Sequence, residues 1–440
     1  MKKYIVKGGV PLRGEVSVSG AKNVALKALV AAALTREEVE IDNVPLIYDL
    51  FIMIDIIREL GGEVKILDHQ LKIRVGDIKK HKISLDKASE IRTSSMFLAP
   101  LLARTGQAII PNPGGCRIGA RPIDRIVEGL KKLGCDIVYD SNDGYFHAKT
   151  KGLVGAHHKF DKNTHTGTET MILAAVLARG RTVLENAAQE PEIDELIILL
   201  NNMGGKVIRS RSRTIVIEGV EKLHGTKFSI GPDRNEVVTF ALAGLATGGE
   251  ATVVGAEKKS IKAFLDKFSQ AGANWQEVEG GIHFSGKDLR STEVTTSFFP
   301  GFMTDWQGPW AVLMTKAQGI SIVHETVYEN RFSYIGELLR MGAKIELFNP
   351  KVKNPQELYN FNWADDKNEY FHAAKIYGPT PLHNAALSIS DLRAGATLVL
   401  AALAASGESV IHGIEHIDRG YEDFAGRLKK LGANIKRLED

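Results

Sequence analysis

The sequence predicts an α/β protein built from six repeats of about 70 residues, and two series of regularly spaced glycines predict it. In the first series a helix-like stretch ends at a glycine and runs into a β-like segment. Glycine is common after a helix because it adopts the left-handed conformation at little cost. This first series falls at intervals of 73, 70, 68, 70 and 90 residues, at Gly61, Gly134, Gly204, Gly272, Gly342 and Gly432. The second series is spaced by 74, 69, 70 and 88 residues, at Gly106, Gly180, Gly249, Gly319 and Gly407.

Each repeat is expected to run strand, helix, strand, helix, strand. The first helix is made of alanine, leucine and other apolar residues on all sides, as in residues 23–34 and 394–405. The second is amphipathic, with charges on one face, as in residues 126–133. A helix that is apolar all round belongs inside a domain, with sheets and other helices packed outside it. Closed domains are therefore expected, and an open solenoid is the alternative.

The last interval is about 20 residues longer than the others. The additional residues lie in 349–379, a polar segment with several aromatic residues and three prolines. A segment of this composition between regular elements predicts a surface insertion in the last repeat rather than a further domain.

Composition restricts the class of protein. The 440 residues suffice for two to four domains, and 44% hydrophobic with 25% charged residues is typical of folded chains. The net charge of +3 argues against a nucleic-acid partner. Two cysteines cannot form a disulfide framework, and the 13 histidines show no metal-ligand spacing, so no metal is expected. Apolar runs such as residues 396–405 are too short for membrane insertion, and a cytoplasmic location is expected.

Residues 112–125, NPGGCRIGARPIDR, have the composition of a loop that faces an anion. Four glycine and proline residues surround Cys116, and Arg117, Arg121 and Arg125 stand nearby. Neighbouring arginines favour the thiolate, which would make Cys116 available as an acid, base or nucleophile. The alternative is a tight turn with an inert cysteine. Cys135 follows a helix-ending glycine and is expected to serve packing alone.

Polar and charged residues recur where the apolar helices begin. Helix N-termini carry a partial positive charge and free N–H groups, which suit phosphate or carboxylate. If these helix starts meet at one cleft, they would bind a polyanionic substrate beside a general base, although each residue alone could be a helix cap or a surface ion pair. This set comprises Lys22, Arg92, Arg121, Arg234, Asp305, Asp391, Arg393 and Arg419.

Two segments outside the repeat pattern add to this set. Residues 298–310 surround Asp305 with aromatic residues, which could desolvate its carboxylate and bring its pKa toward that of a base. Residues 325–332 mix charged and aromatic residues. Both could equally be packed loops.

In these motifs the sequence resembles the enolpyruvyl transferases over essentially its whole length, and within them the branch that acts on UDP-N-acetylglucosamine. The branch that acts on shikimate 3-phosphate lacks the cysteine loop. The resemblance is carried by SGAKN (19–23), PGGCRIGARP (113–122), ENAAQEPEI (185–193), PDRNE (232–236), TDWQ (304–307), ETVYENRF (325–332), SDLRAGATLVLA (390–401) and HIDRGYE (416–422).

The resemblance implies two similar domains, each an inside-out α/β barrel of three repeats with buried apolar helices and sheets outside. One domain would span residues 22–230, and the other would combine residues 1–21 with 231–440. A cleft between them would close on the substrates.

The resemblance also implies an activity: transfer of enolpyruvyl from phosphoenolpyruvate to the 3′-hydroxyl of UDP-N-acetylglucosamine through a tetrahedral intermediate, early in peptidoglycan synthesis. No metal or organic cofactor is implied. Cys116 would be the acid or aid product release, Asp305 would be the base, and Lys22 would take part in catalysis.

Binding roles follow from the same resemblance. Phosphoenolpyruvate would be held by Lys22, Arg92, Arg121, Arg393 and Arg419. The UDP-sugar would be contacted by Asn23, Arg92, Arg121, Pro122, Ile123, Asp124, Lys162, Thr166, Gly167, Asp305, Val327 and Asp391.

One segment departs from the family pattern. FDKNTHTGTET (160–170) has one residue more than the usual Lys-x-Ser-Val-Gly pattern, which leaves the contacts of Lys162 and Thr166 open. The acceptor could therefore be another nucleotide sugar or a shikimate-like molecule. A catalytically silent six-repeat binding protein is the remaining alternative, although such a protein has no need for an opposed acid and base.

Overall fold

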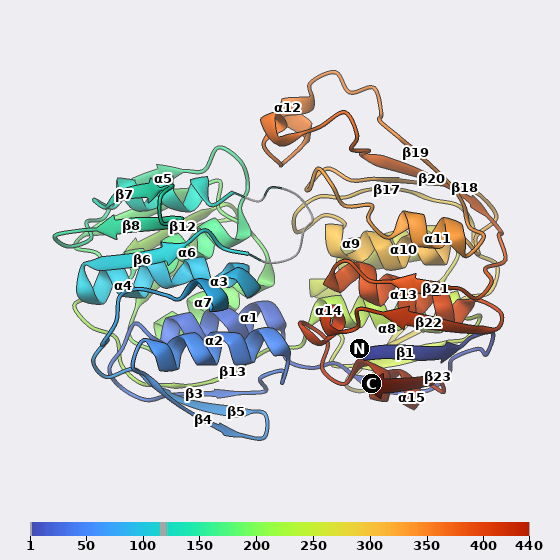
Figure 1. Cartoon of the computed structure of the whole chain (residues 1–440), viewed down its shortest axis with the longest axis horizontal. Helices are drawn as coiled ribbons and strands as arrows, with labels where there is room; N and C mark the ends of the chain where they lie inside the picture. The colour runs from blue at the N-terminus through green and yellow to red at the C-terminus, as the bar shows by residue number, and fades with distance from the viewer. Residues whose placement is uncertain (1, 115–119, 121, 440) are drawn as a thin grey trace. The chain divides into compact units, whose positions relative to one another are not determined.

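The computed structural model describes residues 2–114, 120 and 122–439, so Cys116 and Arg121 lie outside the described residues. The described chain forms two compact units (Figure 1). Residues 20–114 and 122–231 form the central unit, and residues 2–19 and 232–439 belong to the terminal unit. The chain passes from one unit to the other after Ser19 and after Gly231.

The described part of the central unit contains three sheets, with strand orders β13-β3-β5-β4, β11-β12-β10-β9 and β6-β8-β7. Its strands are β3 (Val39–Asp42), β4 (Glu63–Leu67), β5 (Gln70–Arg74), β6 (Gln107–Pro111), β7 (Asp136–Asp140), β8 (Tyr145–Lys149), β9 (His157–Lys159), β10 (Arg181–Glu185), β11 (Lys206–Arg211), β12 (Thr214–Glu218) and β13 (Lys227–Ser229). Its helices are α1 (Lys22–Ala32), α2 (Tyr48–Glu59), α3 (Leu85–Glu90), the 3-10 helix η1 (Arg92–Phe97), α4 (Leu98–Thr105), α5 (Asp124–Lys132), α6 (His165–Ala175) and α7 (Pro191–Asn202).

The terminal unit likewise has three sheets among its described residues, ordered β21-β22-β1-β23, β15-β16-β14-β2 and β17-β18-β20-β19. Its strands are β1 (Lys2–Lys7), β2 (Glu15–Ser17), β14 (Ala251–Val254), β15 (Asn274–Val278), β16 (Gly281–Ser285), β17 (Glu293–Thr295), β18 (Gly319–His324), β19 (Lys344–Phe348), β20 (Ala373–Gly378), β21 (Ala386–Ser388), β22 (Glu408–His412) and β23 (Asn434–Glu439). Its helices are α8 (Arg234–Ala246), η2 (Lys258–Ser260), α9 (Lys262–Gln270), η3 (Thr304–Trp306), α10 (Gln307–Met314), α11 (Ile335–Arg340), α12 (Pro355–Leu358), η4 (Trp363–Asp365), α13 (Leu392–Ala404), α14 (Glu415–Asp418) and α15 (Phe424–Lys430).

The apolar helices lie inside, as predicted. In the terminal unit every residue of α8 and of α10 is buried, and α13 is buried except at Arg393. Figure 1 shows these three helices in the middle of the unit, between strands of its sheets. In the central unit the apolar helices α1, α4 and α6 likewise contribute buried residues to the core. A helix that is apolar on all sides is removed from water only when other elements cover it on all sides. This requirement explains why the sheets lie outside these helices.

Among the described residues, the second repeat has only an isolated bridge, Lys82↔Ile109, in place of its first strand, and the last repeat ends at β23, which pairs with β1. The other four repeats have one strand more than expected. The order is strand, helix, strand, helix and then a two-stranded hairpin, as in β13, α8, β14, α9, β15 and β16. The two strands of this hairpin pair antiparallel from Asn274↔Ser285 to Val278↔Gly281. The short polar turn between them does not interrupt the β pattern, so the sequence predicts one strand where the structure has two.

The first glycine series adopts the expected conformation, with φ between 81° and 97° at all six positions. In the second series the left-handed residue after α8 is Gly248, with φ 78°, and Gly249 directly follows it. Gly249 is needed for a different reason: a Cβ there would lie 1.8 Å from the carbonyl oxygen of Leu12.

Residues 349–379 contain more than a surface excursion. Their C-terminal part is β20, which pairs with both β18 and β19. The remainder carries α12, which stands out from this sheet in Figure 1, and an aromatic stack in which the Tyr359 and Trp363 rings are 5.4 Å apart. Tyr359 is buried, and its hydroxyl lies 3.1 Å from Nε2 of His324.

Among the described residues no helix is long and apolar enough to cross a membrane.

Candidate active site

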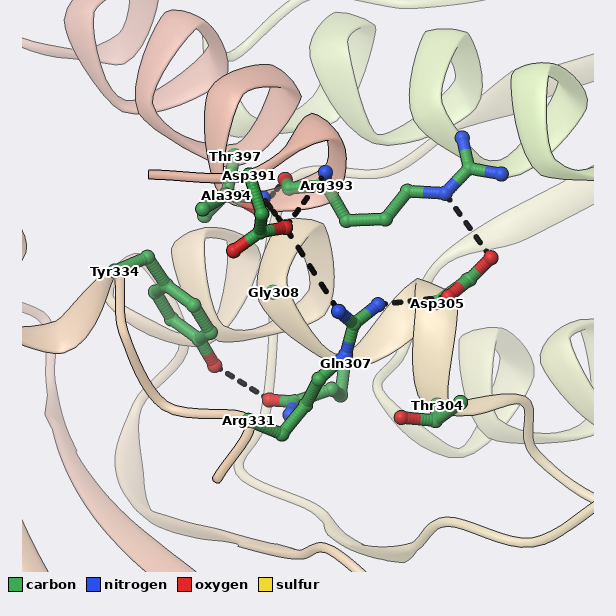
Figure 2. A pocket seen from close by; sticks show the side chains of 10 residues that line it. All are labelled: Thr304, Asp305, Gln307, Gly308, Arg331, Tyr334, Asp391, Arg393, Ala394 and Thr397. Atoms are coloured by element: carbon green, nitrogen blue, oxygen red, sulfur yellow. Dashed lines mark hydrogen bonds and ion pairs between the residues drawn. The ribbon is translucent and has the colours of Figure 1, made fainter. Parts of the chain in front are cut away.

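Asp305 lies at the centre of a charged cluster in the terminal unit (Figure 2). Its Oδ1 accepts a hydrogen bond from Nη2 of Arg331 at 2.7 Å, and its Oδ2 accepts one from Nε of Arg393 at 3.0 Å. Nη1 of Arg331 also lies 3.8 Å from Oδ1 of Asp391. Two guanidinium groups and two carboxylates therefore alternate around one pocket, whose other lining residues are Thr304, Gln307, Gly308, Tyr334, Ala394 and Thr397.

Helix starts position three members of this cluster, Asp305, Asp391 and Arg393. Asp305 lies in η3, directly before α10. Asp391 is the N-cap of α13, and its Oδ1 accepts the backbone N–H groups of Arg393 and Ala394, both at 3.0 Å. Its other oxygen accepts a hydrogen bond from the hydroxyl of Ser333. Asp391 is thus held by the helix it caps, which orients Arg393 toward Asp305.

Arg393 is held from its other side by Tyr421, whose hydroxyl accepts from Nη1 at 2.9 Å. Burial raises the pKa of Tyr421, so its hydroxyl stays protonated. Burial opposes the charge of Arg393 and of Arg331, but their anionic neighbours outweigh it and raise the pKa of both guanidinium groups. The pocket therefore keeps two positive charges beside the carboxylates of Asp305 and Asp391.

The aromatic residue directly after Asp305 does not pack on its carboxylate. Trp306 points into the core, where its ring lies 5.5 Å from that of Phe302, and its Nε1 donates to Asn235 at 3.0 Å. The Asp305 side chain faces the pocket and is 26% exposed. Neighbours in a 3-10 helix point in different directions, so aromatic residues close in sequence need not pack on the carboxylate.

In the central unit, Lys22 begins α1 and its Nζ lies 2.7 Å from Oδ2 of Asp49, in the first turn of α2. Both side chains are nearly buried. Asn23 is the next residue of α1 and is half-buried. Arg92 begins η1, and its Nη2 donates to the carbonyl oxygen of Pro122 at 2.7 Å.

The residues expected at the UDP pocket lie around the starts of α5 and α6. Ile123 is the buried N-cap residue of α5 and Asp124 is its first residue. Thr164, close to Lys162 in the chain, is the N-cap of α6, and its hydroxyl accepts the N–H of Gly167 at 3.1 Å. Lys162 and Thr166 are half-buried on either side of this cap.

Three further predicted residues lie in the terminal unit. Arg419 follows α14, whose last residue Asp418 accepts two hydrogen bonds from Arg437, both at 2.7 Å. Val327 lies after β18, and its N–H donates to Glu325 at 2.7 Å. Arg234 begins α8 and its guanidinium stacks 5.2 Å from the ring of Phe299.

Sequence reasoning assigned no role to Arg331, Tyr421 or Asp49. Each of them reaches its partner from a different element, and no repeat position marks them. A signal did exist for Asp49, because it is a charged residue at the start of an otherwise apolar helical face. Arg331 lies in the mixed charged and aromatic segment 325–332, and it is the residue of that segment that lines the pocket.

Within the described residues, one group has the types and spacing of metal ligands: Asp140, Asp143 and His147 in the β7–β8 hairpin. Asp143 already accepts the N–H of Tyr145 and contacts Nε2 of His147, both at 2.9 Å. These contacts account for the arrangement as a hairpin turn at the surface.

The chain matches known proteins over its whole length. Residues 6–428 match the family model of EPSP synthase (3-phosphoshikimate 1-carboxyvinyltransferase). The UDP-N-acetylglucosamine 1-carboxyvinyltransferase of Koribacter versatilis is 41% identical, covering 100% of this chain and 97% of its own length. That of Magnetococcus marinus is 40% identical and covers 100% of both chains.

Solved structures agree in fold. The enolpyruvyl transferase NikO from Streptomyces tendae superposes with a TM-score of 0.86 at 23% identity, covering 99% of each chain. EPSP synthase from Acinetobacter baumannii gives 0.71 at 16% identity, covering 100% of each chain. The chain therefore belongs to the enolpyruvyl transferase family, in which its curated relatives at about 40% identity are UDP-N-acetylglucosamine 1-carboxyvinyltransferases.

Proposed function

We propose that this protein transfers the enolpyruvyl group of phosphoenolpyruvate to the 3′-hydroxyl of UDP-N-acetylglucosamine, with release of phosphate, in the synthesis of peptidoglycan precursors. The single observation that carries the proposal is identity of about 40% over the full chain to several enzymes named for that activity. The pocket around Asp305 supports it, because it combines a carboxylate with two fixed cations.

The reaction proceeds by addition and elimination. Asp305 accepts the proton of the 3′-hydroxyl, and the sugar oxygen forms a bond to C2 of phosphoenolpyruvate while C3 takes up a proton. Cys116 is the candidate for the acid. The tetrahedral adduct then loses a proton from C3 and breaks its C2–O bond to phosphate, which regenerates the double bond and releases inorganic phosphate.

Cations stabilise the negative charge of both substrates. In the terminal unit Arg393 is held between Asp305 and Tyr421, so its position is fixed before substrate binds. Such preorganised charges stabilise a developing anion without further rearrangement. The remaining phosphoenolpyruvate ligands of this proposal are Lys22, Arg92, Arg121 and Arg419.

The UDP-sugar contacts follow the sequence assignments. Asn23, Asp305 and Asp391 contact the sugar, with Arg92 and Arg121 nearby. The nucleotide lies against residues 122–124, against Lys162, Thr166 and Gly167 at the start of α6, and against Val327.

Phosphate release from phosphoenolpyruvate tests the proposal. The acceptors to compare are UDP-N-acetylglucosamine, UDP alone, shikimate 3-phosphate and none. Release with UDP-N-acetylglucosamine alone is the expected result. Release with shikimate 3-phosphate would reassign the acceptor, and release with none of them would favour a silent binding protein.

A further inference from the structure

Glu325 is a buried carboxylate that the proposed reaction does not use. It follows β18 and has no exposed surface. Its Oε1 accepts the backbone N–H groups of Val327 at 2.7 Å and Tyr328 at 3.1 Å. Its Oε2 accepts the hydroxyl of Thr304 at 2.8 Å and Nε2 of Gln307 at 3.3 Å.

All four partners act as donors, so the arrangement fits an ionised carboxylate that only accepts. Burial raises the pKa of Glu325, and these donors together with Arg331 oppose that effect. Gln307 is itself oriented, because its Oε1 accepts the hydroxyl of Tyr334 at 2.6 Å, as Figure 2 shows. Gln307 therefore presents its N–H₂ group to Glu325.

The two oxygens of Glu325 hold two different sides of the pocket. On one side, Thr304 and Gln307 flank Asp305 in η3 and at the start of α10. On the other, the turn at Val327 begins the segment that ends at Arg331, whose guanidinium binds Asp305. A closed ring of contacts thus runs from Glu325 through Thr304 to Asp305, and back through Arg331 and its segment.

We propose that Glu325 is a positioning residue that fixes the Asp305 carboxylate relative to the Arg331 guanidinium, an inference that rests on the proposed function. Neither oxygen of Glu325 is left to meet substrate, so its effect reaches the reaction through Asp305. Misplacing a reacting group by about 1 Å can cost about 100-fold in rate.

The alternative explanation is that Glu325 has a purely structural role and only anchors its loop to the sheet. Thr326, the next residue, does this for the same loop: its N–H donates to Oγ1 of Thr296 at 2.9 Å, and its own hydroxyl donates to the Thr296 carbonyl at 2.5 Å. Thr326→Val removes the hydroxyl contact and leaves the Glu325 contacts in place. It is therefore the matched control for a purely structural role.

The experiment compares the full-length protein with Glu325→Gln, Thr304→Val, Thr304→Ser and Thr326→Val. The readouts are kcat, the KM of each substrate in phosphate release, and the melting temperature. Glu325→Gln is expected to lower kcat by about 10- to 100-fold, since its N–H₂ group must face one of the donors. Thr304→Val is expected to lower kcat in the same direction with little change in either KM, and Thr304→Ser is expected to restore it.

Thr326→Val is expected to lower the melting temperature while kcat stays near that of the unchanged protein. If Glu325→Gln fails to fold, the kcat values of Thr304→Val and Thr304→Ser test the proposal instead. Equal kcat values for Thr304→Val, Thr304→Ser and Thr326→Val would overturn the positioning role and leave the proposed function standing. An unchanged protein that releases no phosphate with UDP-N-acetylglucosamine would overturn both.

Discussion

Replacing Asp305 by asparagine removes a negative charge that two guanidinium groups share. The side chains of Arg331 and Arg393 are 5% and 11% exposed, and both bind this carboxylate. Asparagine keeps one carbonyl oxygen, so it can accept from one guanidinium but must present its N–H₂ group to the other. Shape is preserved, while charge and proton acceptance are lost.

The loss of stability can be estimated from these contacts. A hydrogen bond to a charged group contributes about 1.5–3 kcal/mol. Arg331 keeps Asp391 at 3.8 Å, and Arg393 keeps the Tyr421 hydroxyl at 2.9 Å, so neither cation is stranded. We therefore expect Asp305→Asn to lower the free energy of unfolding by about 2–3 kcal/mol, below the cost of breaking a fully isolated buried pair.

The same substitution tests the role of Asp305 as the base. General-base catalysis contributes about 10²- to 10⁴-fold, so kcat should fall by such a factor while substrate binding persists. Urea denaturation and phosphate release are the assays. Asp266→Asn is the matched control, because that carboxylate pairs with Lys262 on the surface of α9. Near-normal turnover, or a stability equal to that of Asp266→Asn, would refute the reasoning.

Three further predictions concern other charged groups and the cysteine loop. Lys27→Met removes the cation 3.3 Å from the buried Glu169, so the free energy of unfolding in urea should fall by about 3 kcal/mol; an unchanged midpoint would contradict this. Burial lowers the pKa of His165, but Glu169 at 3.1 Å outweighs this effect and raises that pKa above 6.5. The stability that this pair contributes should therefore be present below pH 6.5 and be lost as the pH rises. Denaturation midpoints of the unchanged protein and His165→Asn from about pH 5.5 to 8.5 measure this, and parallel curves would argue against it. Cys116 should be alkylated by an epoxide phosphonate such as fosfomycin, faster with UDP-N-acetylglucosamine present, and an unmodified intact mass would contradict that assignment.

The candidate site divides into residues that the repeat pattern predicts and residues that it does not. Lys22, Arg92, Asp305 and Asp391 lie at helix starts, as expected from the regular spacing. A helix start is a local property, set by capping residues and by the onset of an apolar run, so it can be found in sequence. Arg331 was not predicted as a site residue, because it lies in an irregular segment and contacts Asp305 only in the folded protein.

The sequence by itself determined the six repeats, the glycines that end the amphipathic helices, the buried apolar helices and the family. These features are local or periodic, so residue types at a fixed spacing are enough to predict each of them. Only the tertiary structure decides which of the charged and polar residues contact one another. Asp305 and Arg393 are 88 residues apart in the chain, and Thr239 and Tyr421 are 182 apart, yet each pair is in hydrogen-bond contact. The packing of α8, α10 and α13 brings these residues together, and side-chain direction within one turn of η3 sends Trp306 into the core and Asp305 into the pocket.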